Sequence, residues 1–283
     1  MTPLVAAAVL VAAVTHASWN AIAHGIKDQL LAFTLVSGGG ALCGLALLPF
    51  VPLPDGGAWP YLIASAVLHV VYYALLMRSF RLGDFGQMYP IARGTAPLVV
   101  TVLAAAFAGE RPDGWQTAGV VVASAGLVGV ALWGIRGSGA RPHWPALAAA
   151  VATGLSIAGY TVVDGLGVRA SGSSIGYIAW LMALEGLAVP AYALAVRRGS
   201  LPRQLRPFAR RGLLGGALSV FAYSLVLWAQ TRAPLAPIAA LRESSIIVGA
   251  AIGTVLFKER FGGPRMVAAG LLVVGIGLML HAG

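Results

Sequence analysis

The chain has 283 residues, 59% of them hydrophobic and only 10% charged, with a formal net charge of +10 and a mean hydropathy of +0.85. Soluble domains carry about 25% charged residues, so this composition excludes a water-soluble globule and predicts an integral membrane protein. Long apolar runs, rather than short alternating strands, favour an all-α membrane fold.

Apolar runs of membrane-crossing length occur along the whole chain. A transmembrane helix needs about 20 apolar residues, and runs of this kind predict ten such helices. No Lys or Arg precedes the first run, so we expect a retained helix rather than a signal peptide. Between charged or Pro/Gly-rich breaks, the expected segments are 3–24, 30–50, 60–80, 86–108, 115–135, 144–165, 172–196, 211–231, 236–257 and 264–281.

Two arginines lie inside apolar segments, and their surroundings repeat. Arg93 and Arg242 are 149 residues apart, and each is followed 17 residues later by a Glu-Arg pair. The repeat predicts an N-terminal five-helix half over 1–136, a linker over 137–143 and a C-terminal five-helix half over 144–283. Because each half has an odd number of helices, the second would cross the bilayer in the opposite sense, as an inverted repeat.

The distribution of basic residues predicts how the chain is oriented. Fourteen Lys and Arg residues fall in loops on one side, many of them in 197–211, against three in loops on the side of both termini. Cytoplasmic loops carry this excess, so we expect both termini on the periplasmic or extracellular face of a bacterial-type inner membrane. The positive charge thus indicates cytoplasmic loops and anionic lipid headgroups rather than nucleic acid.

Two pairs of segments in the chain are similar to a known transporter family. RGTAPLVVTVLAAAFAGE with GVVVASAGLVGVAL, and RESSIIVGAAIGTVLFKE with AAGLLVVGIGLML, resemble the EamA-type transporters of the drug/metabolite transporter (DMT) superfamily. The resemblance extends over essentially the whole chain. It implies a bundle in which the first four helices of each half surround a central cavity and the fifth is peripheral. It also implies export or exchange of a small solute, without indicating which one.

The two arginines are the first candidates for a substrate site. A charged side chain at the centre of a membrane helix costs at least ~2.5–3.5 kcal/mol. At 1.5 Å per residue, Arg93 and Arg242 lie about 9–10 Å inside their helices. Guanidinium groups suit carboxylate, phosphate or phosphonate partners, so we expect a substrate with an anionic group. Structural pairing with a carboxylate and snorkelling to the membrane surface are the alternatives.

Two acidic residues are expected at membrane depth. Glu185 stands near the centre of WLMALEGLAVPAYAL, and Glu243 directly follows Arg242. A carboxyl group in such a place can carry a proton for coupled transport or act as the counter-ion of an arginine. The alternative is a neutral, hydrogen-bonded carboxyl group with a role in packing.

Aromatic and polar side chains complete the expected cavity lining. Tyrosine and tryptophan would suit a cationic or amphiphilic substrate through stacking or cation–π contact, whereas helix packing and interfacial anchoring are the alternatives. Asn20 shares a helix face with His16, which is equally consistent with hydrogen bonding between helices. The residues expected to line the site, besides the charged ones, are Trp19, Asn20, Tyr73, Tyr89, Tyr160 and Tyr223.

These features together predict a secondary transporter, either an exporter or an exchanger. It would move a small organic metabolite with an anionic group by alternating access, with proton or solute counter-transport left open. The alternatives are a lipid or lysolipid flippase, and a carrier of a cationic amine bound by the aromatic residues and Glu185. The sequence has no HExxH motif and no phosphate-binding loop, so we expect neither an enzyme nor a bound metal or cofactor.

Overall fold

The structure of the protein is a computed structural model that describes residues 1–82, 85–137, 143–256 and 263–281. These residues are mostly helical and include no β-strand. The all-α fold expected from the long apolar runs is therefore confirmed for the described part of the chain. Most of the predicted linker, 138–142, lies outside the described residues.

The N-terminal half consists of long helices joined by short loops. The Thr2 side chain caps the first helix by accepting a hydrogen bond from the Val5 amide, and Asp28 caps the second through the Leu31 amide. Such caps satisfy amides that have no partner inside the helix. The elements are α1 (Pro3–His24), α2 (Gln29–Leu47), η1 (Leu48–Phe50), η2 (Gly56–Ala58), α3 (Trp59–Leu82), α4 (Phe85–Phe107) and α5 (Gly114–Gly137).

The C-terminal half contains two helices that are interrupted where the sequence predicts continuity. The expected segment 172–196 forms α7 and α8, and the expected segment 236–257 forms α11 and α12. The prediction of one continuous helix is wrong at both places. The elements are α6 (Trp144–Arg169), α7 (Ser174–Glu185), α8 (Ala188–Arg197), η3 (Arg198–Ser200), α9 (Leu201–Leu205), η4 (Arg206–Phe208), α10 (Ala209–Gln230), α11 (Leu235–Arg242), α12 (Ser245–Leu256) and α13 (Gly263–His281).

The first interruption has a local physical cause, and the second is marked by a change in backbone hydrogen bonding. In a continuous helix the Gly186 carbonyl would bond to the amide of residue 190, but Pro190 has no N–H to donate. The Ser37 hydroxyl of α2 donates to this carbonyl instead, at 2.8 Å. At the second break the Glu243 amide bonds three residues back, to Ala240, which tightens the turn.

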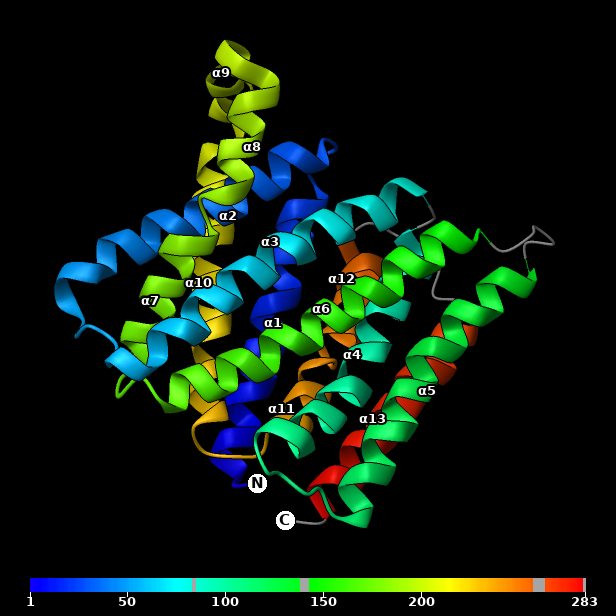
Figure 1. Ribbon diagram of the computed structural model, residues 1–283. Helices are drawn as coiled ribbons and strands as arrows, with labels where there is room; N and C mark the ends of the chain where they lie inside the picture. The colour runs from blue at the N-terminus through cyan, green and yellow to red at the C-terminus, as the bar shows by residue number, and fades with distance from the viewer. Residues whose placement is uncertain (83–84, 138–142, 257–262, 282–283) are drawn as a thin grey trace.

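Helices from the N-terminal part of the chain pack against helices from the C-terminal part. The first helix of the N-terminal half, α1, packs against α10, while α6 packs against α3, and α5 lies along α13. Figure 1 shows α5 and α13 side by side at one edge of the molecule. Their backbones approach closely, because a Cβ at Gly119 would lie 2.5 Å from the Gly275 carbonyl oxygen. Small residues permit such contacts between membrane helices.

The outer surface of the helices is apolar, as a bilayer requires. Val102, Val267 and Val273 are among the exposed large hydrophobic residues. The protein is a multi-pass membrane protein, whereas ten crossings and an inverted repeat remain predictions. Five stretches of the described residues are long and apolar enough to cross a membrane, namely Pro3–Ala23, Gln29–Phe50, Gly56–Ser79, Trp144–Arg169 and Ser174–Gln230.

The most basic part of the chain lies far from the termini. Figure 1 shows α8 and α9 projecting at one end of the molecule, while the N-terminus and the end of α13 lie at the other. Arg198, Arg203 and Arg206 are exposed on this projection. At its base, Arg197 Nη2 donates to Asp28 Oδ2 at 2.6 Å, so the projection is tied to the start of α2.

Candidate functional site

A small cavity lies where the two halves meet. It has a volume of about 60 Å³, enough for about four to six waters at 10–15 Å³ each. Helices α1, α3, α4, α6, α7, α10 and α11 all contribute to its wall. The residues that line it are Ala12, His16, Trp19, His69, Tyr72, Tyr73, Arg93, Tyr160, Met182, Glu185, Ser219, Ala222, Tyr223, Val226 and Arg242.

Arg93 of α4 contacts residues at the second helix interruption with its side chain. Its side chain is buried, and Nε lies 2.8 Å from Glu243 Oε2. This contact is a close ion pair without the geometry of a directed hydrogen bond. Nη2 also donates to Ser245 Oγ at 3.3 Å, and the guanidinium lies 5.9 Å from the centre of the Tyr89 ring. The counter-ion of Arg93 thus comes from the opposite half of the chain.

Arg242, the last residue of α11, has much weaker partners. It is only 5% exposed, yet among the described residues no carboxylate forms an ion pair with it. Nη2 donates to the Tyr160 hydroxyl at 3.5 Å, and Nε has no hydrogen-bond partner among the described residues. A buried charge without a counter-ion is costly. Its place at the carboxyl end of α11 offsets part of that cost, because the helix dipole there favours a cation.

Glu185 stands on the other side of the cavity, at the end of α7. Its Oε2 atom lies 3.1 Å from His69 Nδ1, which is also 3.0 Å from the Ser65 carbonyl oxygen. The His69 ring stacks on Tyr160, with ring centres 4.0 Å apart. One aromatic stack therefore separates the carboxyl group of Glu185 from the guanidinium of Arg242. Both helix interruptions place a charged residue against the cavity.

Not every residue expected at the site reaches the cavity wall. Asn20 is outside the cavity lining, and its amide donates to the His16 carbonyl of its own helix at 2.8 Å. Tyr89 and Glu243 contact Arg93 from behind the wall rather than facing the cavity. Lining positions are occupied by Trp19, Tyr73, Tyr160, Tyr223, Arg93, Arg242 and Glu185.

One buried acid was not singled out from the sequence. Asp164 of α6 is fully buried and accepts hydrogen bonds from the hydroxyls of Tyr177, at 2.9 Å, and Tyr223. Asp164 lies next to the expected end of this segment, at 165. In fact α6 continues to Arg169. A charged residue in an apolar run, the signal that identified Glu185, would have found it.

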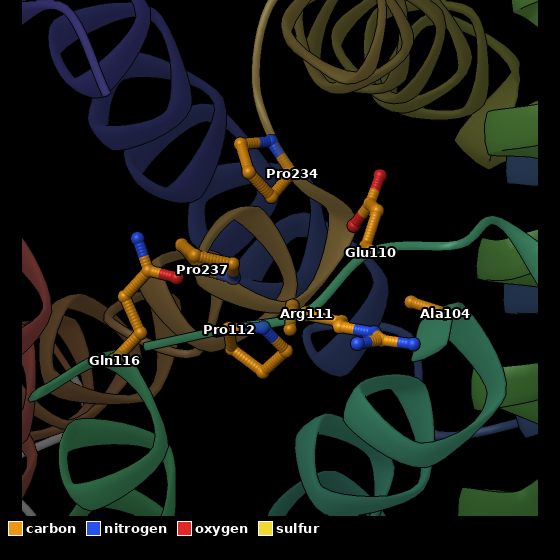
Figure 2. Close-up of a pocket in the computed structure, with 8 residues that line it drawn as sticks. Ala104, Glu110, Arg111, Pro112, Gln116, Pro234 and Pro237 are labelled. Carbon is orange, nitrogen blue, oxygen red and sulfur yellow. The ribbon is translucent and has the colours of Figure 1, made fainter. Parts of the chain in front are cut away.

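A second pocket, of about 90 Å³, lies between the α4–α5 loop and the start of α11 (Figure 2). In Figure 2, Glu110 stands beside Pro234 and the start of α11. Its carboxylate accepts hydrogen bonds from the Leu235 amide at 2.6 Å and from Arg169 Nη2 at 2.7 Å. Glu110 therefore caps α11 and fastens the α4–α5 loop to the C-terminal half. The equivalent Glu259 lies outside the described residues.

The long apolar helices are consistent with the family to which the chain is similar. The profile of the EamA-like transporter family matches residues 3–132 and 144–281. The chain belongs to this family. EamA-like proteins are membrane transporters of the DMT superfamily, so this chain is a DMT-type membrane transporter.

Comparison with other proteins adds information on the fold only. A solved structure described as "Crystal structure of protein" is similar, with a TM-score of 0.72 and 17% sequence identity. The match covers 99% of this chain and 97% of that chain. None of the curated proteins matches this EamA-like chain.

Proposed function

We propose that this EamA-like protein is a secondary transporter of a small organic metabolite with an anionic group. The observation that carries the proposal is Arg242, a buried guanidinium that lines the cavity and forms no ion pair among the described residues. Membrane proteins place such charges where a substrate or ion passes. Export and exchange both fit this site.

A carboxylate or phosphoryl group would bind Arg242 in place of its long contact with Tyr160. The guanidinium offers two parallel N–H donors, which match the two oxygens of such a group. Arg93 would add a second positive charge on the same wall, once its ion pair with Glu243 loosens. The aromatic rings of Trp19, Tyr72 and Tyr73 would contact the rest of the substrate.

Alternating access would require the two halves to move against each other. In an inverted repeat, the first helix of each half can pack against the third helix of the other. The packing of α1 against α10 and of α6 against α3 supports such a repeat. The family profile also matches two ranges that correspond to the predicted halves. A cavity of about 60 Å³ is too small for most metabolites, so it would have to widen to hold a substrate. The breaks after Glu185 and at Glu243–Ser244 are suitable hinges, because both adjoin the cavity.

The orientation follows from the same arrangement. The basic projection of α8 and α9 lies at the end opposite to the N-terminus and the end of α13. Basic loops are retained in the cytoplasm, so the termini would face the periplasm or the extracellular space. The pocket beside Glu110 would then lie on the outer side, where Glu110 and Arg169 hold the two halves together.

Glu185 and Glu243 would have different parts in transport. Glu243 is the counter-ion of Arg93 and would be released when a substrate anion replaces it. The ion-pair partner of Glu185 among the described residues is His69, a weak counter-ion, which makes Glu185 the candidate for a proton that is coupled to transport.

A thermal-shift experiment tests the anion site. A ligand that binds only the folded protein stabilises it by RT ln(1 + [L]/Kd), about 2.7 kcal/mol at a hundredfold excess over Kd. The purified protein would be screened against carboxylates, phosphonates, amino acids and quaternary amines. Stabilisation by an anion should disappear in Arg242→Ala and persist in Arg232→Ala, which removes an exposed arginine stacked on Trp228. Equal anion stabilisation of both variants would contradict the proposal.

A carrier of a cationic amine is the second candidate. The observation that favours it is the group of aromatic rings on the wall that also holds the carboxyl group of Glu185. Such an arrangement can bind a cation by charge and by cation–π contact. Stabilisation by quaternary amines alone, lost in Glu185→Gln and kept in Arg242→Ala, would establish this function instead.

A further inference from the structure

Asp164 is the most deeply buried acid in the described part of the protein that the substrate site does not use. It is 0% exposed and lies one layer behind the cavity wall. Its Oδ1 atom accepts a hydrogen bond from the Tyr177 hydroxyl at 2.9 Å, and Oδ2 accepts one from the Tyr223 hydroxyl. The Ser65 hydroxyl is a third donor. The hydrogen bonds from these donors fix the position of the carboxyl group. A carboxyl group in such a place can bind or release a proton.

Two chains of side chains connect Asp164 to the cavity. The shorter one is Tyr223, which lines the cavity and donates directly to Asp164. The longer one passes through Ser65, whose Oγ atom lies 3.2 Å from His69 Nδ1. The same His69 nitrogen is 3.1 Å from Glu185 Oε2, and Glu185 lines the cavity. Asp164 and Glu185 are therefore the two ends of one chain of polar contacts, in which His69 and Glu185 lie within ion-pair distance without hydrogen-bond geometry.

The charges around these two acids do not balance if both are ionised. No cation among the described residues forms an ion pair with Asp164, and the positive charge of Arg242 acts on it only from a distance. Oε2 of Glu185 has no hydrogen bond from the described residues although Glu185 is only 5% exposed. Buried carboxylates without counter-ions are costly. The ionisable groups that face the pair are His69, Tyr72 and Tyr73 from α3, Tyr160 from α6, Tyr177 from α7, Tyr223 from α10 and Arg242 from α11.

We propose that Asp164 and Glu185 form a proton-binding pair that couples transport to a proton gradient. The inference rests on the proposed transport function, and it assigns to Asp164 a role that the substrate site leaves open. The proton comes from water in the cavity and forms an O–H bond with one of the two carboxyl groups. When the cavity opens to the other side, that O–H bond breaks and the proton returns to water. Ser65 and His69 let the proton pass between the two acids.

The aromatic residues connect this pair to the anion site. Tyr160 accepts from Arg242 and stacks on His69, and its ring lies 6.5 Å from that of Tyr223. An anion bound to Arg242 would cancel the positive charge that reaches Asp164. It would therefore favour a proton on the pair, and by reciprocity the proton would strengthen anion binding. Binding of substrate and proton would support each other.

Infrared spectroscopy can detect such a proton without any substrate. The protein reconstituted in lipid would be titrated with acid and base while the carbonyl stretch of protonated carboxylic acids is recorded. We expect a band from a buried carboxylic acid that changes with pH. The band should lose intensity in both Asp164→Asn and Glu185→Gln, because each removes one of the two sites. Asp113→Asn, at an exposed helix cap that asparagine also forms, should leave the band unchanged.

A gentler variant covers the case in which Asp164→Asn does not fold. Tyr223→Phe removes one donor to Asp164 but keeps the ring, and it should shift the pH midpoint of the same band. A band that is absent at every pH in the unaltered protein would overturn the proposal. So would a band that Glu185→Gln and Tyr223→Phe both leave identical to that of the unaltered protein. Because the measurement needs no substrate, its result is independent of the ligand screen that tests the anion site.

Discussion

The ion pair between Arg93 and Glu243 gives a prediction whose size can be worked from the structure. Glu243→Gln keeps the shape of the side chain and removes its charge, which leaves the Arg93 guanidinium buried without a counter-ion. The Nε–Oε2 distance of 2.8 Å puts the charge centres roughly 4 Å apart, where an effective dielectric constant of 20 gives an attraction of about 4 kcal/mol. Breaking buried pairs typically costs about 3–5 kcal/mol. We therefore expect a loss of about 3–5 kcal/mol in the free energy of unfolding.

The chain supplies a matched control for this measurement. The pair between Arg197 and Asp28 is even closer, at 2.6 Å, but both side chains are partly exposed. Asp28→Asn keeps the cap of α2 and should cost less than about 1 kcal/mol, because water screens an exposed pair. Reversible unfolding of both variants in mixed micelles, with increasing denaturing detergent, measures the difference. Equal losses for Glu243→Gln and Asp28→Asn would refute the view that burial makes the first pair important.

The remaining predictions concern the helix contacts and the orientation. Glu110→Gln should lower the free energy of unfolding by about 1.5–3 kcal/mol in the same assay, because a charged acceptor is lost at the start of α11; an unchanged value would contradict a holding role. Gly119→Val should lower the melting temperature, because its Cβ would meet the Gly275 carbonyl, whereas Gly129→Val adds a Cβ where no atom lies within 4 Å; similar behaviour of the two variants would exclude close packing of α5 on α13. A reporter fused to either terminus should read as periplasmic, and a cytoplasmic signal at both ends would reverse the orientation.

The sequence by itself determined the class of the protein and the most unusual members of the site. Few charges and long apolar runs indicate a membrane protein, since each helix must present apolar side chains to lipid. Arg93, Arg242 and Glu185 were identifiable for the same reason, because a charge inside an apolar run needs a compensating partner or a role. The repeat around the two arginines is also visible in the sequence, and it singled out the residues that meet at one cavity.

Only the tertiary structure decided which of these groups are paired. Nothing local to Arg93 indicates that its counter-ion is Glu243, because the two are brought together by packing of α4 against α11. The equivalent Arg242 has no such ion pair among the described residues, so two arginines in matching sequence contexts differ in partner and in the role we propose.

The helix interruptions and boundaries also depend partly on the local sequence and partly on neighbouring helices. Pro190 gave a local signal for the break at Gly186, but the Ser37 hydroxyl that accommodates the freed carbonyl comes from another helix. The boundary of α6 beyond Asp164 could not be fixed from an apolar run alone, because burial by α3, α7 and α10 lets polar residues continue the helix. Composition and periodicity are properties of a local segment. Pairing, breaks and buried polar contacts depend on neighbours distant in the chain, and the folded arrangement alone supplies those.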